Sequence, residues 1–185
     1  LSNIFQFQVI NLGSYKGIDK LKDKNSQLKD IYLSKNNFNY RLGGKVLLFA
    51  PENSDLFWLS SKLSFGRNLE SRQGYFYSDI TGTFKLLDWL VFNINPKYFS
   101  SGMESFGVIG FSSNINLAKK IQLLSETNIG LNEYSENNVT FSLRYSYLPK
   151  KSIDLYLTNA AGFVDIGQFF QSENYKVGVK LNFIF

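Results

Sequence analysis

The chain has 185 residues and a formal net charge of +5, and its 44% of hydrophobic residues against 19% of charged ones exclude disorder as the main state. One domain covering residues 1–185 is expected. Cysteine and histidine are both absent, which excludes disulfides, thiolate catalysis and most zinc sites and removes the commonest general base. We therefore expect no metal and no cofactor. No run of apolar residues is long enough to predict a transmembrane helix.

The first half of the chain predicts antiparallel strands, because apolar and polar residues alternate with the period of two that a strand requires. In Phe38–Ala50, for example, Tyr40 and Leu42 alternate with Arg41. A long charged connection over Asn11–Asn36 precedes that segment. The expected strands of this half are Leu1–Leu12, Phe38–Ala50, Leu56–Arg67, Tyr75–Leu86 and Trp89–Tyr98.

The second half of the chain repeats the same alternation. In Val139–Leu148, Phe141 and Leu143 alternate with Ser142 and Arg144. The pattern predicts about ten strands in all, and most reach the roughly nine to eleven residues that a tilted strand needs to cross hydrocarbon. The expected strands here are Ser105–Leu117, Ile121–Leu131, Val139–Leu148, Ile153–Ala160 and Tyr175–Phe185.

The connections between these segments are of two kinds, and the two kinds alternate along the chain. Tight turns are expected at Pro51–Asp55, Lys85–Asp88, Leu117–Lys120 and Leu148–Lys151. Longer connections are expected at Arg67–Gly74, Phe99–Glu104, Asn132–Asn138 and Ala160–Asn174. Short turns at one end and longer loops at the other indicate an up-and-down sheet. Within the last loop, Ala160–Phe170 is apolar and contains glycine, so it either folds into the mouth of the sheet as a constriction or extends the neighbouring strands.

The end of the chain carries the most specific pattern. Apolar side chains alternate with Lys176, Gly178, Lys180 and Asn182, and the last residue is aromatic. This stretch resembles the bacterial outer-membrane β-barrel superfamily, whose last strand ends in an aromatic residue after alternating hydrophobic ones. The resemblance implies an all-β, up-and-down antiparallel transmembrane β-barrel of about ten strands. It also implies an assembly signal for the barrel-assembly machinery, formed by Tyr175, Val179, Leu181, Phe183 and Phe185.

The alternative fold is a soluble antiparallel barrel or sandwich whose apolar face turns inward. Two features weigh against it besides the terminal aromatic. The polar face of the strands is mostly Ser, Thr, Asn and Gly with scattered charges. Trp58 and Trp89 begin strands that leave tight turns and so predict, with Tyr147, an aromatic belt at a membrane interface. We therefore expect an outer-membrane location, with lipid and lipopolysaccharide around the chain.

If the apolar face meets lipid, basic residues would line the lumen and raise the local concentration of anions. Two arrangements remain open. Either these cations form the selectivity surface of a pore, or the lumen is plugged and they form buried pairs, such as Arg144 with Asp154 or Glu126 with Arg144. The predicted lumen-lining residues are Arg41, Lys45, Lys62, Lys97, Arg144, Lys176 and Lys180.

The function expected from these features is a porin-like passive channel for small polar or anionic solutes. One alternative is that the chain is the C-terminal barrel sector of a larger outer-membrane export, secretion or polysaccharide-related protein. The other is a closed structural or adhesive barrel that acts through its outer loops. An enzyme is not expected, because the enzymes of this superfamily resemble each other in relying on a catalytic histidine. Nucleic acid is not expected as a partner either, since the Lys and Arg residues are spread one or two per strand.

Overall fold

The computed structural model describes residues 5–12, 39–50, 56–68, 72, 74–101, 104–149, 151–161 and 165–183. These residues form a ten-stranded antiparallel sheet in which each strand pairs with the next one along the chain. A short 3₁₀ helix, η1 (Asp165–Gln168), is the one helical element among them. The predicted all-β class, the up-and-down order and the number of strands are therefore confirmed for the described part of the chain.

The strands follow the predicted segments closely, with the largest differences at the loops. β5 continues to Ser101, further into its loop than expected, whereas β6 begins at Ser105 as expected. β10 begins at Gln171 instead of Tyr175, with a register shift between Gln171 and Lys176. Residues 13–36 of the predicted charged connection and the turn Pro51–Asp55 lie outside the described residues. The strands are β1 (Phe5–Leu12), β2 (Asn39–Phe49), β3 (Phe57–Asn68), β4 (Gly74–Leu87), β5 (Leu90–Ser101), β6 (Ser105–Ala118), β7 (Ile121–Gly130), β8 (Asn138–Leu148), β9 (Lys151–Ala160) and β10 (Gln171–Phe183).

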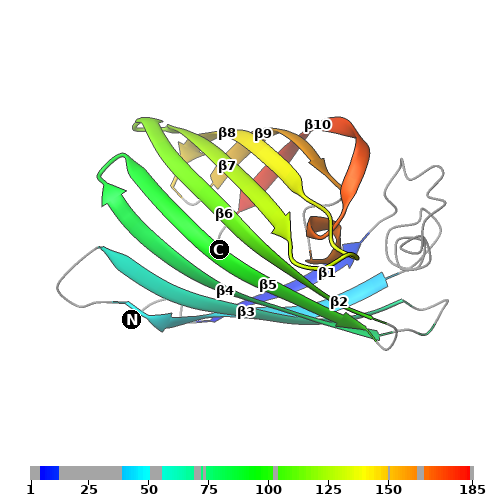
Figure 1. Ribbon diagram of the computed structural model, residues 1–185. Coiled ribbons are helices and arrows are strands. Elements are labelled where there is room, and N and C mark those ends of the chain that lie inside the picture. The colour runs from blue at the N-terminus through cyan, green and yellow to red at the C-terminus, as the bar shows by residue number, and fades with distance from the viewer. Residues whose placement is uncertain are drawn as a thin grey trace.

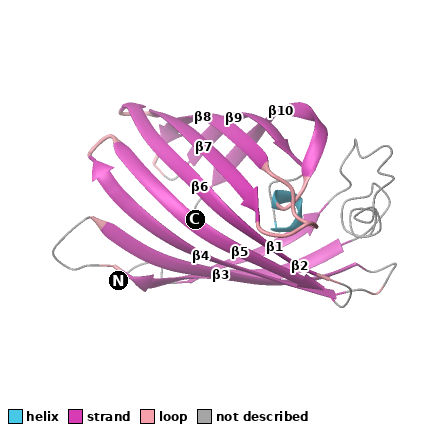
Figure 2. Cartoon of the chain, in the orientation of Figure 1, coloured by secondary structure: helices cyan, strands magenta, loops and turns pink. Residues whose placement is uncertain are grey.

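The sheet is strongly curled, so that β8–β10 lie opposite β2–β4 and η1 lies on the concave side (Figure 1). Figure 2 shows the tight turns gathered at one end of the sheet, with η1 near the other. Two of these turns, Asp88–Trp89 and Lys119–Lys120, contain only two residues. Within the described ranges, no pairing joins β1 to β10, so the sheet is curled without being closed.

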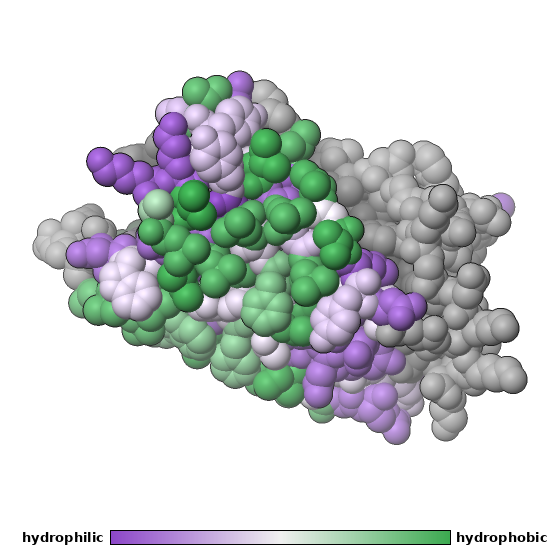
Figure 3. Space-filling view, turned by 90° about the horizontal axis from the view of Figure 1, so that it is seen from above, coloured by the Kyte–Doolittle hydropathy of each residue, from purple (hydrophilic) through white to green (hydrophobic). Residues whose placement is uncertain are grey.

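The polarity of the sheet is inverted relative to that of a water-soluble protein. Val177 and Val179 on the convex face of β10 are 73% and 63% exposed, whereas Asp154 and Lys97 on the concave face are each only 4% exposed. Among the described residues, eleven buried polar side chains outnumber nine buried hydrophobic ones. Apolar side chains cover the middle of the outer surface, and polar groups gather toward its ends (Figure 3). In water-soluble proteins the buried side chains are more often apolar.

The two tryptophans of the predicted aromatic belt lie in different surroundings. Trp58 pairs with Thr83 and lies on the same face of β3 as Ser60, which is buried on the concave side. Trp58 therefore alternates with the apolar side chains of its strand, as its position in the sequence pattern predicts, and the aromatic belt at a membrane interface stays a prediction. Trp89, in the turn between β4 and β5, is exposed as expected.

Among the described residues, a cluster of buried apolar side chains lies on the concave side near the loop end of the sheet. Phe169 and Phe170, which follow η1, are completely buried there and pack against the wall formed by β4, β5 and β6. The loop Ala160–Phe170, as far as it is described, thus folds inward and does not simply extend the neighbouring strands. We call its described residues the inward segment. We call the buried group as a whole the inner aromatic cluster, and its members are Tyr75, Tyr77, Phe99, Phe106, Val108, Ala161, Phe169 and Phe170.

Candidate functional site

The best-defined polar contact on the concave face joins Arg144 of β8 to Asp154 of β9. The two residues stand directly opposite each other in the sheet register. Arg144 donates from Nε and Nη2 to the two oxygens of Asp154, at 2.7 and 2.8 Å, and Asn182 of β10 donates to the same carboxylate at 2.9 Å. One of the two ion pairs expected from the sequence is therefore present.

The other expected partner of Arg144, Glu126, is bound to Lys97 instead. The ammonium group of Lys97 pairs with the Glu126 carboxylate and also donates to Asn128 Oδ1 at 2.7 Å. Asn128 donates on to Asn138 Oδ1 at 2.9 Å, and Asn138 donates to the backbone oxygen of Gln168 at 2.7 Å. This polar network runs from β5 to η1 and satisfies groups that are buried on the concave face.

The inward segment is held on both sides of η1 by further hydrogen bonds. The backbone amide of Glu136 donates to the Phe169 oxygen at 2.8 Å, and the Glu136 carboxylate accepts from the amide of Gln171 at 2.6 Å. Lys176 donates to the Ala161 oxygen at 3.2 Å. The ring of Phe169 lies 6.0 Å from that of Phe99, measured between centroids. The segment therefore reaches from β9 and β10 across the concave side to the opposite wall.

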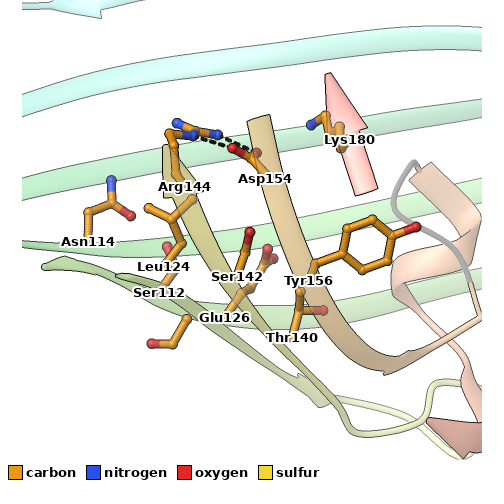
Figure 4. A pocket seen from close by; sticks show the side chains of 11 residues that line it. Ser112, Asn114, Leu124, Glu126, Thr140, Ser142, Arg144, Asp154, Tyr156 and Lys180 are labelled. Carbon is orange, nitrogen blue, oxygen red and sulfur yellow. Dashed lines mark hydrogen bonds and ion pairs between the residues drawn. The ribbon is translucent and has the colours of Figure 1, made fainter. Parts of the chain in front are cut away.

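Below the inner aromatic cluster, toward the tight-turn end, the concave face of β6–β10 is hollowed by a cavity of about 210 Å³. Arg144, Asp154 and Lys180 form one row of its lining, and Ser142 and Tyr156 form the next (Figure 4). Glu126 and Thr140 extend the cavity lining toward the inner aromatic cluster. Every lining residue except Leu124 carries a hydroxyl, amide or charged group, so the cavity offers hydrogen-bond partners to a small polar molecule.

The seven predicted lumen cations have different surroundings. Lys97, Arg144 and Lys176 are engaged as described above, and the Lys62 ammonium lies 4.9 Å from the centroid of the Tyr77 ring. Lys45 is exposed and stands opposite Lys62 in the register, and Lys180 is exposed at the cavity. The backbone of Arg41 pairs with Gly66, and its side chain lies outside the described part. The described cations share the concave face of the sheet, and their role as a selectivity surface stays a prediction.

The predicted assembly signal lies on the convex face of β10 as far as it is described. Tyr175, Val179 and Leu181 are all exposed on this one face. Phe183 is paired through its backbone with Lys151, and Phe185 lies outside the described residues. The structure thus places three of the five side chains together, and recognition by the assembly machinery stays a prediction.

Sequence reasoning missed two sets of residues. Ser142 and Tyr156 line the cavity, and the alternation of β8 and β9 would have placed them beside Arg144 and Asp154. Phe169 and Phe170 were singled out only as part of an apolar loop, since no local pattern reports which wall such a loop will contact.

No protein-family model matches this chain, and no curated protein matches it in sequence. None of the described residues belongs to a helix long and apolar enough to span a membrane. In the same part of the chain, no group of three or more acidic side chains is gathered closely enough to hold a metal ion.

Proposed function

We propose that this chain forms a β-barrel in a bacterial outer membrane and passes small polar or anionic solutes passively through its interior. The observation that carries this proposal is the inverted polarity of the sheet. Leu, Val, Ile and Phe side chains cover the convex face, while Ser, Asn, Asp and Lys side chains are buried on the concave one. Lipid is the surroundings in which such an arrangement is stable, because exposed apolar side chains are then solvated by hydrocarbon.

Closure of the curled sheet is part of this proposal. In hydrocarbon every backbone N–H and C=O group must be hydrogen-bonded. Pairing of β1 with β10 would supply partners for the backbone groups of these two edge strands. An even number of strands would leave both ends of the barrel wall on the same side of the membrane, as single-chain bacterial barrels require.

Three features of the interior support passage of small solutes along a narrow path. The cavity offers hydroxyl, amide and charged groups to a polar solute. The inner aromatic cluster occupies the loop end, so the inward segment would act as a constriction that limits the size of the solute. The excess of basic over acidic side chains on the concave face favours anions over cations.

The experiment that tests this proposal is refolding of residues 1–185 into detergent micelles, followed by gel electrophoresis with and without boiling. A compact band that disappears on boiling, together with conductance in planar lipid bilayers, is the expected result. A chain that folds in plain buffer without detergent would contradict the membrane location. A closed barrel without conductance would favour an adhesive or structural role over transport.

A second candidate, a sector of a larger barrel, is favoured by one observation. The described residues contain no pairing between β1 and β10, so strands from elsewhere could lie between these edges. In that case residues 1–185 alone would give no heat-sensitive band, and a longer chain that includes the additional strands would.

A further inference from the structure

We infer that the cavity between β6 and β10 is a binding site for a small carboxylate that carries at least one hydroxyl group. This inference deepens the proposed function and rests on it for the solute's route, but the binding site itself is argued from the cavity alone. The cavity's volume of about 210 Å³ corresponds to several water molecules and admits a solute of a few carbon atoms.

The charged row of the cavity carries one more positive than negative group. Asp154 stands between Arg144 on β8 and Lys180 on β10 in the sheet register. The pair with Arg144 uses Nε and Nη2, which leaves Nη1 of the guanidinium outside it. Lys180 adds a second cation at the rim, where Figure 4 shows its ammonium group directed toward the pair. A single carboxylate on the solute would balance this row.

The neighbouring row of the cavity lining supplies hydroxyl groups. Ser142 and Tyr156 stand opposite each other in the register, two residues along their strands from Arg144 and Asp154 and on the same face. The hydroxyl oxygen of Ser142 is buried and has no hydrogen-bond partner within the protein. A buried hydroxyl without a partner costs free energy, and a hydroxyl of the solute would satisfy it.

The negative group nearest to the hydroxyl row does not repel such a solute strongly. Glu126 lines the cavity, but its charge is balanced by Lys97. The site therefore has a positive end for the carboxylate and a neutral, hydroxyl-lined middle. A solute with both groups would engage both rows, whereas a neutral polyol or a simple fatty acid would engage only one of them.

Three probes of equal carbon number separate these contributions: glycerate, glycerol and propionate. Their dissociation constants would be measured by NMR titration of the full chain refolded in detergent micelles. We expect glycerate to bind most tightly. Lys180→Gln should weaken both glycerate and propionate about tenfold, which is the loss expected for one charge-assisted hydrogen bond. Ser142→Ala should weaken glycerate and glycerol and leave propionate unchanged. Lys180→Arg, which keeps charge and donors, should retain the affinity.

The matched control is Lys45→Gln, which removes an exposed cation of the concave face on β2, outside the cavity lining. It should leave all three dissociation constants unchanged. Equal losses in Lys45→Gln and Lys180→Gln would show a general electrostatic effect and overturn the inference, as would equal binding of glycerate and glycerol. Conductance in bilayers without glycerate binding would contradict the proposed binding site and leave the proposed channel intact. Glycerate binding without conductance would contradict the proposed channel and support the binding site.

Discussion

At the scale of single residues, the concave face is organised by charges that meet across strands. Arg144 and Asp154 lie on adjacent strands, and their parity on the polar face made this pair predictable. Lys97 and Glu126 lie on β5 and β7, with β6 between them. Gly110 of β6 lies beside this contact, and a Cβ there would overlap the side-chain oxygen of Asn95 and crowd that of Asn128, which accepts from Lys97. No sequence pattern reports such a contact between strands that are not adjacent.

The Arg144–Asp154 pair gives the first prediction. Asp154→Asn should lower the free energy of unfolding by about 2 kcal/mol, because it leaves a guanidinium without its counter-charge at a site that is about two-thirds buried. Urea unfolding of the micelle-bound protein measures this change. Asp88→Asn is the control, since the Asp88 side chain is 97% exposed and its pair with Lys85 should contribute little. Equal effects of the two changes would contradict the account.

Gly178 gives a second prediction at this scale. A Cβ at this position would overlap the ring of Tyr156, which lies over the glycine from the neighbouring strand. Gly178→Ala should therefore displace that ring and cost about 1–3 kcal/mol of stability. The control is Gly74→Ala, where the nearest atom would lie at an ordinary contact distance of 3.6 Å. Unfolding curves that coincide for the two variants would show that the ring does not depend on the glycine.

At the scale of elements, the strands were predictable and the inward segment was not. Period-two alternation located the ten strands. The turn expected at Lys85–Asp88 lies at Asp88–Trp89 instead, because β4 continues to Leu87 and β5 begins at Leu90. The start of β10 was placed four residues too late, because Gln171, Ser172 and Glu173 are polar and carry no alternation. The direction of the inward segment depends on contacts with β4–β6, far away in sequence, so the sequence left it open.

The inner aromatic cluster gives the element-scale prediction. Phe169→Ala should lower stability by about 3–5 kcal/mol, the usual cost of emptying a buried aromatic position, and should raise single-channel conductance because the constriction loses a ring. Planar-bilayer recording measures the second effect. Phe141→Ala, on the convex face, removes the same ring without touching the concave side and should leave conductance unchanged. A Phe169→Ala channel with native conductance would show that the cluster does not limit the path.

At the scale of the whole molecule, one property of the sequence determines the architecture. Each strand carries apolar residues on one parity and polar residues on the other, which predicts a two-faced sheet. It does not by itself say which face is enclosed. The curl encloses the polar face, as the exposed Val179 and buried Asp154 show. The closed barrel that the resemblance implied has no pairing between β1 and β10 in the described residues. Alternation alone could not predict closure, because pairing of the edges depends on the accumulated twist and tilt of all ten strands.

The most direct test of a lipid-facing convex surface compares two arginine substitutions in equally exposed leucines. Leu155 lies in the middle of β9 and is 52% exposed, and Leu148 ends β8 beside a tight turn and is 51% exposed. Stability in lipid vesicles would be measured by urea unfolding. We predict that Leu155→Arg costs about 2–4 kcal/mol and Leu148→Arg no more than about 1 kcal/mol, since the penalty depends on depth in the bilayer. Equal tolerance of both arginines would mean that the convex face meets water, and would contradict the account.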